Sequence, residues 1–294
     1  DRLRRTRVTV FDLTETNPTV VGLPYPPSLA SGLADPRVAS YHPHPFGRPD
    51  ARAAVAAACR TSGWTVDVSR IVLTASTSEA YAFLFKLLCD PGDEILVPQP
   101  SYPLFDLLAG LEGVSVARYG LHPFDAWAID RVGLANAVTG STRAILIVTP
   151  NNPTGSMLRA SDRDWLVSTA ADRQLALISD EVFADYPLSP LADAVSLSSE
   201  DRVLTFTLGG LSKSAGLPQM KLAWIGVSGP DAPVREALGR LELIADTYLS
   251  VSTPVQVAAG SLIEAGRDIR GALARRLSEN LSVLRSTVRA YPAL

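Results

Sequence analysis

The stretch Leu211-Ser212-Lys213-Ser214-Ala215-Gly216-Leu217-Pro218 joins two apolar, β-branched runs at 203–208 and 222–227. Both runs predict buried strands. Lys213 is therefore expected at the carboxyl end of a buried strand, which is an unusual place for a charge. Burying an unpaired ammonium is costly, so such a group tends to lose its proton. A neutral lysine amine is the nucleophile that forms a Schiff base with an aldehyde.

Lysine is rare in this chain. Only three of its 27 basic side chains are lysines, at Lys86, Lys213 and Lys221. Where arginine replaces lysine nearly everywhere, a retained lysine suggests that its amine chemistry or its compact head is needed. The competing interpretation is a partly exposed lysine in a turn, and this stretch alone leaves it open.

Composition restricts the class of protein. The 294 residues are 47% hydrophobic and 19% charged, as in a soluble globular protein. A net charge of −3 argues against a nucleic-acid partner, and no apolar run approaches the ~20 residues that span a bilayer. Cys59 and Cys89 are isolated in helical patterns, which favours a reducing, cytoplasmic location. His42 and His44 could suggest a metal pair, but the flanking prolines favour a loop, and no metal site is predicted.

Outward from the lysine, short apolar runs alternate with helical patterns. This alternation predicts an α/β fold with a mostly parallel sheet covered on both faces. The further expected strands are 71–74, 94–97, 143–148 and 175–178, with a candidate at 7–11. The expected helices are 51–61 (with Asp50 as N-cap), 79–89, 104–111, 162–173 and about 254–289.

Unusual polar residues follow these strands, where ligands of parallel α/β sheets bind. Ser76, Thr77, Ser78 and Glu79 open a helix after strand 71–74. A helix N-terminus suits a phosphate, because its free N–H groups and dipole face the ligand. The alternative is a capping box with Ser76 as N-cap and Glu79 three residues later, and both interpretations can hold together.

Four more strand ends each carry one candidate. Tyr102 could stack on a planar ring or cover the core, and the amide of Asn152 could donate to an oxygen or stabilise its turn. Asp180 is a carboxylate at a buried strand end, which is expensive without a partner, and Lys213 follows the last strand. A phosphate cradle, an aromatic plate, an amide donor, a buried carboxylate and an amine together describe a pyridoxal phosphate (PLP) site.

These residues resemble the class I/II aminotransferases, the fold-type I PLP-dependent enzymes. The similarity rests on motifs in the family's order: Pro91-Gly-Asp93, Pro100-Ser-Tyr-Pro103, Asn152-Pro-Thr-Gly155, Ser179-Asp-Glu-Val-Phe183 and Ser212-Lys-Ser214. It covers nearly the whole chain. The resemblance implies a three-layer αβα sandwich with a mostly parallel central sheet and an incomplete small domain.

The resemblance also implies a role for each residue. Lys213 would form the aldimine with PLP and later move the substrate's proton, and Asp180 would pair with the pyridinium nitrogen. Asn152 would donate to the phenolic oxygen, with Tyr102 on one ring face and Val182 on the other. The remaining cofactor-binding positions would be Ser76, Thr77 and Ser78 for the phosphate, Phe183 and Lys221 beside the ring and phosphate, and Tyr41 reaching the phosphate of a neighbouring subunit. The last contact implies a homodimer with shared active sites.

Three positions depart from the family pattern. Phe183 stands where a tyrosine usually donates to the phenolic oxygen, and Lys221 stands where an arginine usually binds the phosphate. Gly210 replaces a serine that often helps to hold it. The pattern indicates a site that can hold PLP with fewer donors. No residue matches the family's arginine that grips the substrate carboxylate.

The expected organisation follows from the resemblance. Residues 1–40 would be an N-terminal segment, 41–250 a large PLP-binding domain, and 251–294 an interdomain helix with the start of a truncated small domain. The expected function is transfer of an amino group from an amino acid to a 2-oxo acid. Other PLP chemistry (a lyase, decarboxylase or cyclase) and a non-catalytic PLP sensor remain alternatives. A dinucleotide-binding oxidoreductase is disfavoured, since Ser-Thr-Ser stands where its glycine-rich turn belongs.

Overall fold

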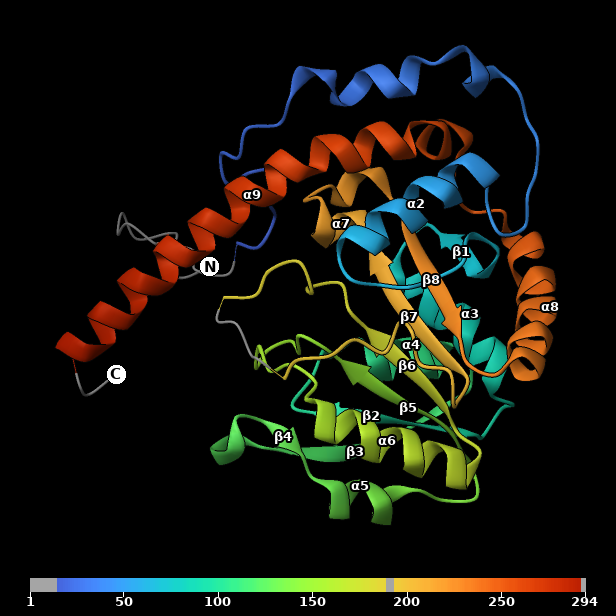
Figure 1. Cartoon of the computed structure of the whole chain (residues 1–294), viewed down its shortest axis with the longest axis vertical. Coiled ribbons are helices and arrows are strands. Elements are labelled where there is room, and N and C mark those ends of the chain that lie inside the picture. Colours follow the sequence, from blue (N-terminus) through green and yellow to red (C-terminus); the bar gives the residue numbers. More distant parts are fainter. Residues whose placement is uncertain (1–14, 189–192, 292–294) are drawn as a thin grey trace, which may run out of the picture.

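The computed structural model describes residues 15–188 and 193–291, so the strand expected at 7–11 lies outside the described residues. The described part of the chain folds around one eight-stranded sheet (Figure 1). Its strands are β1 (Ile71–Thr74), β2 (Glu94–Gln99), β3 (Ser115–His122), β4 (Ala128–Ile129), β5 (Thr142–Val148), β6 (Ala176–Asp180), β7 (Thr205–Gly210) and β8 (Ala223–Ser228).

The strand order is β1-β8-β7-β6-β5-β2-β3-β4. The central pairs are parallel, from β3 through β2, β5 and β6 to β7. The pairs β1–β8, β7–β8 and β3–β4 at the two sides are antiparallel. The α/β class with a mostly parallel sheet is therefore confirmed. Parallel strands must be joined by a crossover connection, usually a helix, which explains why helices separate the central strands in the sequence.

Helices cover both faces of the sheet. They are α2 (Pro49–Thr61), α3 (Thr77–Leu88), α4 (Phe105–Leu111), α5 (Arg131–Ala137), α6 (Ala160–Arg173), α7 (Leu211–Ser214), α8 (Asp231–Tyr248) and α9 (Thr253–Ala290). Short 3-10 turns accompany them: η1 (Pro27–Ala34), η2 (Pro36–Ala39), η3 (Val68–Arg70), η4 (Pro123–Asp125) and η5 (Pro218–Met220). None of the helices in the described part of the chain is long and apolar enough to cross a lipid bilayer.

Alternate residues along each strand supply separate cores. On one face, apolar side chains of α3, α4 and α8 pack against residues such as Ile178, Phe206 and Leu208. On the other face, α2 and α9 cover the β1–β8 side, and α5 and α6 cover the β5–β2 side. This two-sided burial explains the near-continuous apolar runs of the central strands.

Helix α9 lies across the molecule over α2, and the segment containing η1 runs beside it (Figure 1). Its buried residues all fall between Ala258 and Ile269. Beyond them the helix is mostly exposed and extends away from the sheet. The helical periodicity that predicted about 254–289 is confirmed.

Local details differ from the sequence interpretation. Asp50 is not the N-cap of α2, because Pro49 already begins the helix and Arg48 is the capping position; the Asp50 carboxylate accepts from Ala51 N at 3.0 Å within the first turn. Strand β6 continues to Asp180, beyond the predicted end at 178. The sequence analysis did not assign β3, β4, α5 and α8.

Candidate active site

The strand register brings the predicted site residues to the same edge of the sheet. Asp180 pairs with Val148 on one side and with Leu208 on the other. The loops that follow β5, β6 and β7 therefore begin at the same level. These loops carry Asn152, Phe183 and Lys213.

Asp180 is 7% exposed and is held by two donors. The phenol of Tyr81 donates to Oδ2 at 2.5 Å, and the backbone N–H of Val182 donates to Oδ1 at 3.1 Å. Burial raises the pKa of the Asp180 carboxyl, and these two hydrogen bonds and the charge of Lys213 oppose that rise. The prediction of a carboxylate buried at this strand end is confirmed.

The N-terminus of α3 stands beside this carboxylate, because Tyr81 belongs to the second turn of α3. Ser76 is the N-cap: its Oγ accepts from Glu79 N at 3.1 Å. Glu79 returns the contact by accepting from Ala75 N at 2.6 Å. The N-cap role of Ser76 is thus confirmed, whereas Glu79 accepts from Ala75 and not from the N–H of Ser76 that a capping box uses. Thr77 and Ser78 are half-buried in the first turn, where backbone N–H groups have no partner inside the helix.

The loops after β2 and β5 are joined by Asn151. Its Nδ2 donates to Pro100 O at 3.1 Å, and its Oδ1 accepts from Ser101 Oγ at 3.2 Å. Tyr102 and Asn152, the two predicted ligands on these loops, each neighbour one end of this connection. The Asn152 amide makes no hydrogen bond within residues 15–188 and 193–291, whereas Asn151 is 4% exposed and fully engaged.

Tyr102 is joined to the core through Phe105. The two rings lie 6.0 Å apart in an edge-to-face arrangement, and Phe105 makes the same kind of contact with Tyr81 at 5.3 Å. The Tyr102 side chain itself is 38% exposed. The ring therefore packs on the core and also faces solvent, and both interpretations considered for this residue remain open.

Lys213 is exposed, so of the two interpretations that the sequence left open the structure favours the exposed lysine. The residue lies in the single-turn helix α7, and its side chain keeps contact with water. Its Nζ lies 5.5 Å from the centre of the Phe183 ring. The Lys213 side chain thus lies beside the aromatic ring of Phe183.

The backbone around Lys213 is nevertheless tightly held. Tyr186 donates from its phenol to the Lys213 carbonyl at 2.6 Å, and Tyr25 donates to the Gly216 carbonyl at 2.6 Å. Ser214 Oγ donates to Gly210 O at 3.0 Å. Gly266 of α9 packs so closely on Ala215 that a Cβ at position 266 would overlap it. The backbone that carries the Lys213 side chain is thus held in place.

The other predicted positions are less closely grouped. Val182 and Phe183 are half-buried beside Asp180. Lys221 is exposed with φ +52°, two residues before Ala223, which pairs with Gly210 in β7. Tyr41 is 71% exposed in a segment near the α8–α9 junction. Within the described residues no contact connects Tyr41 to Lys213 or Asp180.

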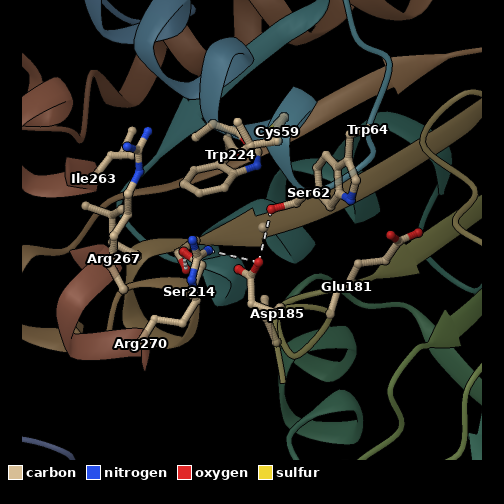
Figure 2. A pocket seen from close by; sticks show the side chains of 18 residues that line it. Cys59, Ser62, Trp64, Glu181, Asp185, Ser214, Trp224, Ile263, Arg267 and Arg270 are labelled. Atoms are coloured by element: carbon tan, nitrogen blue, oxygen red, sulfur yellow. Dashed lines mark hydrogen bonds and ion pairs between the residues drawn. The ribbon is translucent and has the colours of Figure 1, made fainter. Parts of the chain in front are cut away.

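A cavity lies between α2, α9 and the ends of β6 and β7, and its lining includes Val182 and Ser214, the neighbour of Lys213 (Figure 2). Asp185 stands at its edge, where it accepts from Ser62 Oγ at 3.0 Å and pairs with Arg270 at 2.9 Å (Figure 2). Glu181, also buried, accepts from Ser179 Oγ, Ser196 Oγ and Leu197 N. These contacts fasten the chain on both sides of Asp180.

Sequence reasoning missed three residues that shape the site: Tyr81, Asn151 and Glu181. The signal at Glu181 was a second acidic residue at a buried strand end, and the signal at Asn151 was the doubled asparagine before Pro153. Tyr81 stands in an apolar helix face and carries no local signal, because only the fold reveals what its hydroxyl meets.

Comparison with known proteins now identifies the family. The sequence model of aminotransferase class I and II matches residues 30–290. The chain belongs to this family. Among its relatives is the alanine aminotransferase of Mycobacterium tuberculosis (strain H37Rv), 30% identical over 193 residues, which are 65% of this chain and 45% of that protein. The mouse tyrosine aminotransferase is 26% identical over 262 residues, covering 87% of this chain and 58% of that protein.

Solved aminotransferase structures share the fold of this family member. An alanine aminotransferase from Pyrococcus furiosus superposes with a TM-score of 0.86 at 24% identity, covering 99% of this chain and 75% of that one. An aminotransferase from Escherichia coli gives 0.77 at 27% identity, covering 88% and 65%. The chain spans about half the length of the first curated relatives it matches.

Proposed function

We propose that this chain is the cofactor-binding part of a PLP-dependent aminotransferase that moves an amino group from an amino acid to a 2-oxo acid. The observation that carries the proposal is Asp180, a buried carboxylate at the sheet edge, with the α3 N-terminus on one side and Lys213 on the other. A carboxylate in this setting suits a protonated ring nitrogen, and the nearby amine suits an aldehyde.

The residues at this edge fit PLP by the chemistry of their donors and acceptors. The free N–H groups of the α3 first turn, with Ser76, Thr77 and Ser78, would bind the phosphate dianion. Lys221 would add a point charge there. The uncommitted amide of Asn152 would donate to the phenolic oxygen, and Tyr102, Val182 and Phe183 would enclose the ring.

When bound, PLP supplies an electron sink that stabilises a negative charge on the amino-acid α-carbon. The protein has two main tasks. Asp180 would keep the ring nitrogen protonated. Lys213 would hold the cofactor covalently through Nζ, and once released would take the proton from the substrate's α-carbon and return it elsewhere. The hydrogen bonds that hold the α7 backbone would keep Nζ within reach of the cofactor and of the substrate's α-carbon.

Tyr41 would contribute to the site of a second copy in a homodimer, which accounts for its exposure and for its lack of contact with Lys213. On this view residues 1–40 are the N-terminal segment, 41–250 the large domain, and 251–294 the interdomain helix with the beginning of a small domain. The exposed second half of α9 supports that division. Two free cysteines support a reducing, cytoplasmic location.

The test is an absorbance spectrum of the purified chain with PLP, beside Lys213→Ala. A visible band in the wild type alone would establish Lys213 as the anchor. An amino acid that bleaches the band, with recovery on adding a 2-oxo acid, would establish transamination and identify the donor. If the wild type gives no band, the proposal fails for this chain.

A lyase is the second candidate, because one relative is an S-alkyl-thiohydroximate lyase of Arabidopsis thaliana, 28% identical over 201 residues, which are 66% of this chain and 42% of that protein. The same spectrum separates the two. A lyase would consume its substrate and keep the visible band, whereas an aminotransferase would lose the band until a 2-oxo acid is added.

A further inference from the structure

Tyr81 is a buried tyrosine whose hydroxyl donates to the carboxylate of the candidate site. The side chain is 2% exposed, and its phenol donates to Asp180 Oδ2 at 2.5 Å across 99 positions of sequence. A hydrogen bond to an ionised acceptor is about twice as strong as one between neutral groups. This contact therefore has more energetic weight than an ordinary tyrosine hydrogen bond.

The ring of Tyr81 is fixed on more than one side. Phe105 of α4 packs edge-on at 5.3 Å, and Phe85, one helical turn further along α3, lies at 6.0 Å. A locked ring can direct its hydroxyl without losing rotamer freedom on ligand binding. The position of Oδ2 of Asp180 is therefore set by the α3–α4 core.

The other groups around Asp180 contribute less than Tyr81 to keeping its carboxyl ionised. Burial raises the pKa of the Asp180 carboxyl, and a second hydrogen bond comes from Val182 N to the other oxygen. Lys213 contributes charge from α7, but its side chain is exposed and would be engaged by the cofactor. Glu181, the next residue, is also an acid and would oppose ionisation.

We propose that Tyr81 is a positioning residue of the cofactor site: its phenol holds Asp180 ionised and oriented for the ring nitrogen of PLP. The inference rests on the proposed function for the ligand, but the coupling between Tyr81 and Asp180 is a property of the protein alone. Tyr81 acts through Asp180. Burial beside Asp180 raises the pKa of the Tyr81 phenol well above its ordinary value, so it stays a donor at any physiological pH.

The test combines Tyr81→Phe, Asp180→Asn and the double variant with a matched control, Tyr119→Phe. Tyr119 is also 2% exposed and donates to a backbone carbonyl, that of Leu146, at 2.9 Å in the separate core under α5 and α6. Tyr81→Phe and Tyr119→Phe thus delete the same atom from equally buried rings. The difference between them isolates the contact with Asp180.

The first readout is the dissociation constant of PLP. Losing one hydrogen bond to a charged group should weaken binding about 10- to 100-fold in Tyr81→Phe and leave Tyr119→Phe unchanged. In the Asp180→Asn background, Tyr81→Phe should cause little further loss, because the residue it acts through is gone. An equal loss with and without Asp180 would overturn the proposal.

The second readout needs no cofactor: urea denaturation of the PLP-free chain between pH 5 and 9. A carboxyl whose pKa is raised by folding makes stability fall as pH rises from its unfolded pKa to its folded one. In Tyr81→Phe the fall in stability should continue to higher pH than in the wild type. In the Asp180→Asn background, Tyr81→Phe should no longer change the pH dependence. If the two profiles stay parallel, the coupling is absent; if the wild type fails to bind PLP while the profiles differ, only the proposed function fails.

Discussion

The Asn151 amide donates to the Pro100 carbonyl at 3.1 Å and so joins the loops that follow β2 and β5. The same amide donates to Thr154 Oγ1 at 2.9 Å, within its own loop. The residue is 4% exposed, so these hydrogen bonds are made by a buried amide. Asn151 is structural, although it stands directly beside the predicted ligand Asn152.

Asn151→Ala should therefore lower the free energy of unfolding by about 1–3 kcal/mol, because it removes the three hydrogen bonds of a buried side chain. Asn152→Ala is the matched control, since the Asn152 amide makes no hydrogen bond within the described residues and should cost little stability. Urea denaturation measures the stability of both variants. PLP titration of the folded variants should show the reverse order, with the larger loss of affinity in Asn152→Ala. Equal stability losses in the two variants would contradict this division of roles.

The neighbouring asparagines show where sequence reasoning stops. The motif Asn152-Pro-Thr-Gly155 identified the loop. Apolar, β-branched runs identified the strands that precede Asp180 and Lys213. Which of two adjacent amides is buried depends on the loop it meets, and that loop is 51 residues away. Long-range partners of this kind leave no local pattern.

The exposure of Lys213 has the same origin. Its flanking runs do form buried strands, as the sequence predicted. The lysine itself falls in a single-turn helix, whose direction is set by the Tyr186 hydrogen bond and by the close packing of Gly266 on Ala215. Strand β3 was missed because Tyr119 is the one buried residue among its eight, so no apolar run marks it, and β4 was missed because it has only two residues.

Glu181 should make stability depend on pH. Burial raises the pKa of its carboxyl above the unfolded value, so the folded chain holds the proton more tightly. Stability should then fall as pH rises from the unfolded pKa toward the folded one. Glu181→Gln keeps the shape and one of the two acceptor oxygens, cannot titrate, and should flatten that part of the profile in urea denaturation. An unchanged slope would mean that Glu181 is ionised at no cost inside the fold.

Ser76→Ala removes the N-cap of α3 and should cost about 1 kcal/mol of stability. It should also weaken PLP binding, because the hydroxyl stands in the proposed phosphate cradle. The matched control is Asp130→Ala, which removes the cap of α5, where Asp130 Oδ1 accepts from Gly133 N at 2.9 Å. That variant should lose similar stability and keep PLP affinity. If both variants lose affinity alike, the effect of Ser76 is only structural.

The ion pair between Asp185 and Arg270 fastens α9 to the loop after β6, and its two side chains are 16% and 29% exposed (Figure 2). Asp185→Asn keeps a group that Ser62 can reach but leaves the Arg270 charge unpaired. We expect a loss of about 1–2 kcal/mol, between the values for exposed and buried pairs. Partial burial should make the loss persist in 1 M salt, since salt screens buried charges less than exposed ones.

The comparison for this pair is Glu236→Gln, which breaks an exposed i,i+4 contact with Arg240 on α8. Both of those side chains are more than 60% exposed, so the loss should stay within about 0.5 kcal/mol and vanish in salt. Thermal or urea denaturation at low and high salt measures both variants. If Asp185→Asn behaves like Glu236→Gln, the cavity edge is solvated like the outer surface, and α9 is held at this point by its apolar contacts with α2 and α7 alone.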